Sequence, residues 1–141
     1  MMAFKIAQTK AERQACIKIR TDVFVEEQGV PLENEIDDKE NVSTHFLGYI
    51  DGKPVVTARI RPYDNGYKVE RVATLASYRG QGLGRALMIY VAQYAESQGI
   101  HRLILNAQVQ AQLFYEKLGY TAEGDTFLEE DILHVKMTKI L

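Results

Sequence analysis

Residues 69–87 read VERVATLASYRGQGLGRAL, and this stretch decides the fold. It begins with alternating, β-branched residues typical of a strand, passes through a glycine-rich turn, and continues into a helical pattern that opens at Leu83. The first turn of a helix has unpaired N–H groups and the positive end of the helix dipole. Glycines allow an anion to approach this backbone closely. Residues 79–84 are therefore a candidate phosphate site.

Two common phosphate loops do not fit this turn. A P-loop requires Gly-Lys before the helix, and no Gly-Lys occurs here. A dinucleotide fingerprint starting at Gly80 or Gly82 would need glycine or alanine where Arg85 or Leu87 stands. The pattern that remains is Arg-x-x-Gly-x-Gly, formed by Arg79, Gly82 and Gly84. A turn that only packs a helix tightly on a strand, without a ligand, would look similar.

The elements around this stretch indicate a mixed sheet. Upstream, we expect a short strand at 4–6, a helix opened by a Thr9–Glu12 capping box and ending near Val25, and an irregular acidic segment at 32–41. Asp51-Gly52 and Asp64-Asn65-Gly66 predict an antiparallel meander of strands 44–50, 54–63 and 67–75. Downstream, we expect helices at 83–98 and 108–118 and strands at 103–105, 120–123 and 132–140. This is an α+β, or mixed α/β, fold in one domain spanning residues 1–141.

Composition excludes several classes of protein. The net charge of −2 argues against a nucleic-acid groove, and no apolar run approaches the ~20 residues that span a membrane. The N-terminus has no signal-peptide core, and the single cysteine, Cys16, fits a reducing compartment. We therefore expect a cytoplasmic protein with neither a nucleic-acid nor a membrane partner, and leave open a homodimer.

The chain resembles the GNAT superfamily of N-acetyltransferases, and in particular a bacterial branch with the motif at residues 20–28. The glycine-rich loop is similar to that family's coenzyme A pyrophosphate loop, and the element order matches along nearly the whole chain. Residues 114–120, FYEKLGY, look like its second motif. One departure is Ala76, where many members have proline. The resemblance implies a central, mostly antiparallel sheet, splayed between its middle strands and flanked by helices.

The resemblance also implies an activity and its residues. The activity is transfer of an acetyl group from acetyl-CoA to a primary amine of a small molecule or peptide, by direct attack in a ternary complex and without a metal. Tyr115 is the expected proton donor to the departing thiolate, and a backbone N–H near Val72 would hold the thioester oxygen. The expected cofactor-binding residues are Val72, Ala73, Thr74, Arg79, Gly80, Gln81, Gly82, Leu83, Gly84 and Asn106.

The sequence leaves alternatives open for the catalytic base and for the site that binds the acceptor. Glu70 is a candidate base, or a structural partner of Arg59 or Arg61, and His134 ranks behind it. The acidic residues Glu27, Glu35, Asp37 and Asp38 could attract a cationic amine, or form a solvated loop. Arg20, Arg59 and Arg61 suggest instead a carboxylated substrate.

Three rival functions also remain open. The chain could be a CoA-binding sensor or interaction module without catalysis, an acyltransferase with a longer donor, or a ligand-free interaction protein.

Overall fold

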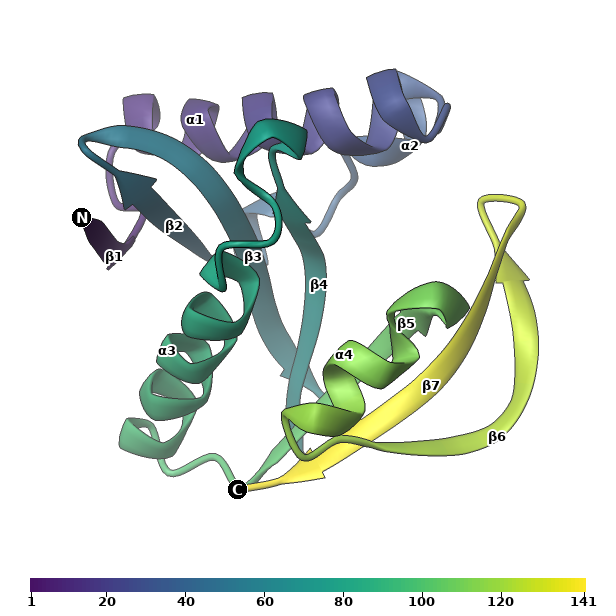
Figure 1. Cartoon of the computed structure of the whole chain (residues 1–141). Helices are drawn as coiled ribbons and strands as arrows, with labels where there is room; N and C mark the ends of the chain where they lie inside the picture. Colours follow the sequence, from purple (N-terminus) through teal and green to yellow (C-terminus); the bar gives the residue numbers. More distant parts are fainter.

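A single seven-stranded sheet organises the chain. The computed structural model describes all 141 residues and places the strands in the order β1-β2-β3-β4-β5-β7-β6 (Figure 1). Only the central pair, β4 with β5, is parallel, and every other neighbouring pair is antiparallel. The strands are β1 (Met2–Ile6), β2 (Thr44–Ile50), β3 (Lys53–Tyr63), β4 (Gly66–Thr74), β5 (Arg102–Gln108), β6 (Thr121–Glu129) and β7 (Ile132–Ile140). The expected mixed sheet is confirmed.

The meander of β2, β3 and β4 forms at the two turns that the sequence predicts. Asp51 and Gly52 have φ angles of 47° and 82°, and Asp64 and Asn65 have φ angles of 47° and 61°. Two successive positive φ values match the twist of a tight hairpin, and Asp, Asn and Gly adopt them at low cost. The turns therefore set the antiparallel register of the three strands.

The N-terminal helix covers one face of the sheet. α1 (Lys10–Arg20) begins with the capping box of Thr9 and Glu12, as predicted, and continues into the π-helix η1 (Thr21–Glu27). The prediction of an irregular segment at 32–41 is partly wrong, because α2 (Leu32–Glu35) and the short 3₁₀ helix η2 (Glu40–Val42) lie there. Their carboxylates pair with buried arginines, a tertiary contact that local sequence does not reveal.

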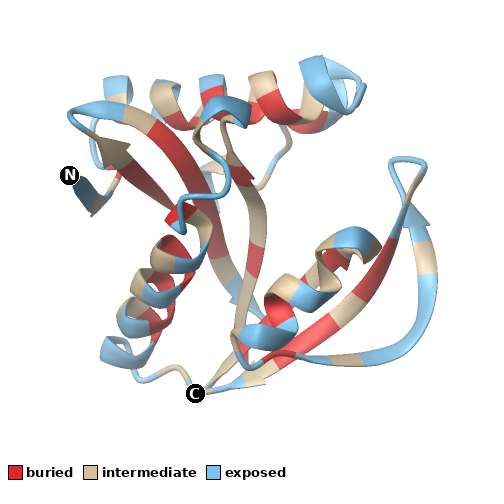
Figure 2. Ribbon diagram, viewed as in Figure 1, coloured by how far each residue is buried: buried red, intermediate tan, exposed pale blue.

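The opposite face is covered by α3 (Leu83–Ser97) and α4 (Gln112–Lys117), with short 3₁₀ turns at Ala76–Tyr78 (η3) and Val109–Ala111 (η4). The buried residues of α3 join a core with Phe46, whereas its neighbour Leu47 packs with Cys16 of α1. Consecutive strand residues thus face two different cores, as the alternation of a strand requires. Figure 2 shows the buried segments on the facing surfaces of helices and sheet. The apolar run 103–105 is buried on both faces, as predicted.

The last hairpin is longer than predicted. We expected a strand at 120–123, but β6 extends to Glu129, with a register shift between Glu123 and Phe127. Most of β6 is exposed and polar, so it lacks the apolar alternation that would mark its length. No helix combines the length and the hydropathy needed to cross a bilayer.

Candidate active site

The two central strands pair for only part of their length. Residues 67–69 of β4 pair with residues 103–105 of β5, and beyond Val69 the two strands separate. Arg71 lies at this point with φ of 56°, in a bulge where β4 shifts its register against β3. A bulge bends a strand and increases its twist, which directs the end of β4 away from β5. The splay expected between the middle strands is therefore present (Figure 1).

A cleft of about 910 Å³ lies where the strands separate. One wall is the end of β4 and the start of α3, and the other is the end of β5 with α4 and the β6–β7 hairpin. Segments of η1 and α2 lie at its edge. The cleft thus brings together the glycine-rich loop, the second motif and the candidate bases.

The glycine-rich loop presents an unpaired backbone at one end of the cleft. Gly80 and Gly82 have φ angles of 80° and 78°, and an added Cβ at either would meet no atom within 4 Å. Gly82 is the N-cap of α3 and offers no side chain to the first turn. The N–H groups of residues 80–85 donate no backbone hydrogen bond, and the first is donated by Ala86 to Gly82. This is the geometry that binds an anion at a helix start.

The residues of this loop contribute unequally to the cleft. Arg79, Gly80, Gly82, Leu83 and Gly84 line it, whereas Gln81 does not. The Leu83 side chain is buried in the core, so only its backbone N–H could reach a ligand.

Arg79 is engaged by two neighbouring segments. Its guanidinium forms a bidentate pair with Glu27, at 2.9 and 2.7 Å, and its Nε donates to the Thr74 carbonyl oxygen at 3.0 Å. Glu27, which we expected as an attractor of an amine or as part of a solvated loop, instead fixes the arginine of the glycine-rich loop to η1.

Tyr115 lies on α4 and lines the cleft. Its ring packs edge-on against Phe114 and Tyr120, at centroid distances of 5.0 and 5.7 Å. Burial raises the pKa of the Tyr115 phenol well above its ordinary value, so the hydroxyl keeps its proton. Its place in the cleft and its protonated state suit a proton donor.

The remaining cofactor candidates lie on the separated strands. Val72, Ala73 and Thr74 line the β4 side, and along these residues β4 has no pairing with β5. Asn106 lies opposite on β5, where its Nδ2 donates to Glu129 Oε1 at 3.4 Å. An open strand edge provides N–H and C=O groups that a ligand can pair with.

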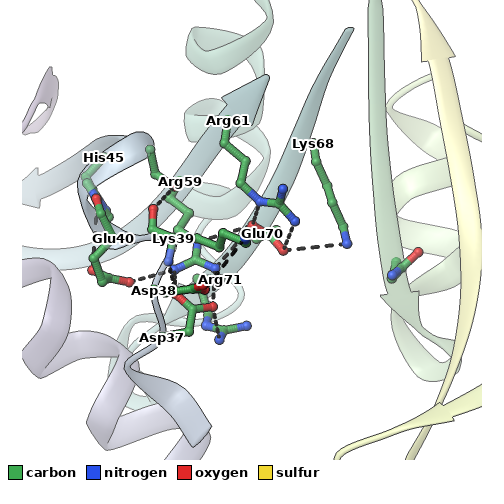
Figure 3. A network of polar contacts seen from close by, with 12 residues as sticks. Asp37, Asp38, Lys39, Glu40, His45, Arg59, Arg61, Lys68, Glu70 and Arg71 are labelled. Atoms are coloured by element: carbon green, nitrogen blue, oxygen red, sulfur yellow. Dashed lines mark hydrogen bonds and ion pairs between the residues drawn. The ribbon is translucent and has the colours of Figure 1, made fainter. Parts of the chain in front are cut away.

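Glu70 is surrounded by cations (Figure 3). Arg61 Nε donates to its Oε1 at 2.8 Å, Arg59 donates to the same oxygen from Nε and Nη2 at 3.3 and 3.2 Å, and Lys68 Nζ lies 3.6 Å from Oε2. Burial raises the pKa of Glu70, but the hydrogen bond from Arg61 and the charges of Arg59 and Lys68 outweigh it, so the pKa lies below its ordinary value. Glu70 lines the cleft, yet this pairing favours the structural alternative over the base.

The acidic segment joins the same network. Arg59 forms a bidentate pair with Asp37, at 2.9 and 2.8 Å, and contacts Glu40 at 2.6 Å. On its far side, Arg20 donates to Glu35 at 2.6 Å and to Glu40 at 2.7 Å. Glu35 is 2% exposed and Arg20 and Arg59 are buried. The expectation of a solvated loop is wrong for Glu35, and the two arginines are already paired with carboxylates of the chain rather than free for a carboxylated substrate.

Arg71 connects this network to the cleft. Its Nε lies 3.1 Å from Glu35 Oε2, without the angle of a hydrogen bond, and its Nη2 donates to Asp37 at 3.2 Å and to the Glu35 carbonyl oxygen at 3.2 Å. The residue at the β4 bulge is thereby tied to α2 and the loop that follows it. Asp38, in contrast, is exposed.

Several cleft residues were not predicted. Gln108 Nε2 of β5 donates to Oε1 of Gln28, the residue just after η1, at 2.9 Å, and Asn34 Nδ2 donates to Glu130 at 3.3 Å. These contacts join segments 80 and 96 residues apart, which no local pattern reports. Glu129 could have been predicted as a cleft residue only by extending the strand predicted at 120–123 as far as the turn at Glu130 and Asp131.

Comparison with known proteins agrees with this geometry. Residues 7–141 match the family model described as acetyltransferase (GNAT) domain. YjcF of Bacillus subtilis (strain 168), named as an uncharacterised N-acetyltransferase, is 40% identical over 135 residues, covering 95% of this chain and 96% of that protein. A crystal structure named as an N-acetyltransferase from Lactobacillus plantarum superimposes with a TM-score of 0.93 at 31% identity, covering 99% and 98% of the two chains. An acyl-CoA N-acyltransferase from Pseudomonas aeruginosa gives a TM-score of 0.87 at 31% identity, with the same coverage.

Proposed function

The chain belongs to the GNAT acetyltransferase family, and from this premise we propose that it transfers the acetyl group of acetyl-CoA to a primary amine. The acceptor is a small molecule or a peptide amine, and the amine attacks the thioester directly while both substrates are bound. The family establishes acetyl transfer in general; the donor, the nitrogen acceptor and the ternary complex are our proposal. Names of two relatives that specify N-acetylation or N-acylation support the choice of nitrogen.

The observation that carries the proposal is the position of the glycine-rich helix start beside the separated strands. One end of the cleft offers unpaired N–H groups suited to a pyrophosphate, and the open edge of β4 leads from there toward Tyr115. A molecule with an anionic end and a long, amide-containing arm fits this succession. Coenzyme A has both features, and Arg85 at the loop adds positive charge, whereas Arg79 is already paired with Glu27.

Within this proposal, the chain's residues have distinct tasks. The N–H groups of residues 80–84 bind phosphate, while the backbone of residues 72–74 and the Asn106 side chain orient the arm that carries the thioester. A backbone N–H near Val72 holds the thioester oxygen as negative charge develops on it. Tyr115 donates its proton to the departing sulfur. Glu70 lines the same cleft as a candidate base, but Arg59, Arg61 and Lys68 already hold its carboxylate.

Calorimetric titration of CoA into the wild type and two glycine variants tests the binding site. Gly82→Asp places a carboxylate where the phosphates are expected to lie, so we expect CoA affinity to fall at least tenfold. Gly99→Asp is the matched control, because Gly99 follows the other end of α3, has φ of 75° and also faces open space. Equal affinities in the two folded variants would refute this placement of the cofactor.

Catalysis is tested separately, by measuring thiol release from acetyl-CoA with a panel of alkylamines, amino acids and short peptides. We expect release above the rate without acceptor for at least one amine. CoA binding without release for any amine would favour the non-catalytic CoA-binding alternative.

A further inference from the structure

We infer that His134 accepts the proton of the attacking amine, with Glu129 as its positioning residue. This inference rests on the proposed function and assigns its base. His134 lies on β7 and lines the cleft on the wall opposite β4, together with Asn106 and Glu129.

The tautomer of His134 is set by the backbone. Its Nδ1 lies 2.7 Å from the carbonyl oxygen of Ile132. A carbonyl oxygen only accepts hydrogen bonds, so Nδ1 carries the proton and donates it. In the neutral ring, Nε2 is then the nitrogen with the free lone pair. The neutral ring can therefore accept a proton at Nε2.

Packing fixes the direction in which Nε2 points. His134 is 6% exposed, and its ring stacks on Phe127 of β6 at a centroid distance of 6.0 Å and an interplanar angle of 23°. On the other side it is paired across the sheet with Gln108 of β5, another residue of the cleft wall. A base held this way needs little reorientation when the substrate arrives.

Glu129 stabilises the protonated ring. Its Oε2 lies 3.6 Å from His134 Nε2, and its Oε1 accepts a hydrogen bond from Asn106 Nδ2 at 3.4 Å. When His134 gains a proton, this carboxylate balances the new charge. Glu129 itself carries no cationic partner among Lys and Arg, unlike Glu70.

The comparison with Glu70 decides between the two candidate bases. Glu70 is already held by Arg59, Arg61 and Lys68, and a proton would have to compete with all three. His134 donates from one nitrogen to a fixed acceptor, and its other nitrogen makes no hydrogen bond and lies 3.6 Å from Glu129 Oε2. The geometry thus favours the histidine.

His134 and Tyr115 together account for every proton that moves in the reaction. His134 Nε2 takes one proton from the acceptor ammonium, which frees the nitrogen lone pair. The nitrogen bonds to the thioester carbonyl carbon, and the C–S bond breaks as Tyr115 gives its proton to sulfur. The nitrogen's second proton restores the Tyr115 phenol, and His134 returns its own proton to solvent.

Other charged groups near His134 can also affect how the reaction rate depends on pH. Glu129 and Glu130 of the hairpin lie on the same wall, and Lys136, further along β7, is 3.8 Å from Glu123. Lys68 and Glu70 are on the opposite wall and pair with each other. Glu129 is the group in direct contact with the ring, so it is included in the test.

The test compares His134→Asn with Glu70→Gln. Asparagine can still donate to the Ile132 carbonyl oxygen through Nδ2 but has no basic nitrogen, and His134→Gln serves as a second variant. Thermal unfolding and CoA calorimetry verify folding and cofactor binding of each variant. Rates are measured against pH with acetyl-CoA and two nucleophiles: the fastest alkylamine of the panel, which is an ammonium at pH 7, and hydroxylamine, which is neutral there.

We expect His134→Asn to lower kcat for the alkylamine by roughly 10²- to 10⁴-fold and to replace the wild-type acidic limb with the rise that follows deprotonation of the amine itself. Hydroxylamine needs no deprotonation before attack, so its rate should fall less than tenfold. Glu129→Gln should reduce the alkylamine rate by a smaller factor, and Glu70→Gln should keep the acidic limb.

Two results would overturn the assignment. An unchanged acidic limb in folded His134→Asn and His134→Gln would exclude His134 as the base, and an equal loss with both nucleophiles would make its role structural. If the wild type releases no thiol with any nucleophile, the proposed function fails as well. If the wild type is active but the two His134 variants keep the acidic limb, the proposed function stands and only the assignment of His134 as the base is wrong.

Discussion

Replacing Arg59 with methionine is expected to lower the free energy of unfolding by about 3 kcal/mol. The Arg59 side chain is fully buried, and its guanidinium contacts Asp37, Glu40 and Glu70. Methionine fills much of the same space but leaves these carboxylates without their shared cation. Removing one partner of a buried ion pair typically costs about 3–5 kcal/mol.

The lower end of that range applies because each carboxylate keeps a second cation. Arg71 remains 3.2 Å from Asp37, Arg20 remains 2.7 Å from Glu40, and Arg61 remains 2.8 Å from Glu70. The remaining pairs limit the loss but do not restore charge balance in the buried network, where attraction is screened least.

Urea unfolding measures this loss, with the m-value as a check that the unfolded state is unchanged. The control is Lys18→Met, which removes a pair with Asp22 whose Lys18 side chain is 77% exposed and should cost less than about 1 kcal/mol. For a domain of this size we expect Arg59→Met to lower Tm by roughly 10 °C. A loss for Arg59→Met no larger than that for Lys18→Met would refute the account of the network.

The same network predicts an acid-sensitive stability. Burial raises the pKa of Asp37, but hydrogen bonds from Arg59 and the charge of that arginine outweigh it and lower the pKa to about 2. The unfolded pKa is about 3.9, so ionised Asp37 contributes roughly 2 kcal/mol above that pH, and the contribution is lost as pH falls toward 2. Asp37→Asn should flatten this decline, as measured by urea unfolding between pH 5 and pH 2; a decline as steep as in wild type would contradict the assignment.

Three further substitutions test the acid, a helix cap and a close strand contact. Tyr115→Phe should lower turnover, measured from steady-state rates, by roughly 10²-fold or more, with little change in CoA affinity by calorimetry. The control is Tyr120→Phe, which removes a buried hydroxyl without a hydrogen-bond partner and should keep the wild-type rate. Thr9→Ala removes the oxygen that accepts from Glu12 N–H at 3.1 Å and should cost about 1 kcal/mol in urea unfolding; no loss would mean that the cap is redundant. Gly48→Ala should cost about 1–3 kcal/mol in the same assay, because the new methyl would overlap Val56 Cγ1 and lie 2.9 Å from Phe4 carbon atoms.

Local chemistry made much of the architecture predictable. The capping box at Thr9 and the hairpin turns at Asp51 and Asp64 each act within a few residues, and the structure has all of them. The glycine-rich helix start was predictable for the same reason, since its unpaired N–H groups follow from the helix itself.

The separation of β4 from β5 has a different status. It was expected from the family resemblance, whereas the bulge at Arg71 that produces it has no marker in sequence, because a non-glycine residue with positive φ is uncommon.

The sequence by itself determined the elements, their order and the loop that opens toward an anion, because turns, caps and periodicity depend on neighbours along the chain. Only the tertiary structure decided how the charges of the cleft are used. It buried Glu35 between Arg20 and Arg71, surrounded Glu70 with three cationic side chains, and left His134 with a fixed tautomer and one free nitrogen. The physical reason is that the state of an ionisable group depends on burial and on the charges around it, and these come from strands and loops far apart in the chain.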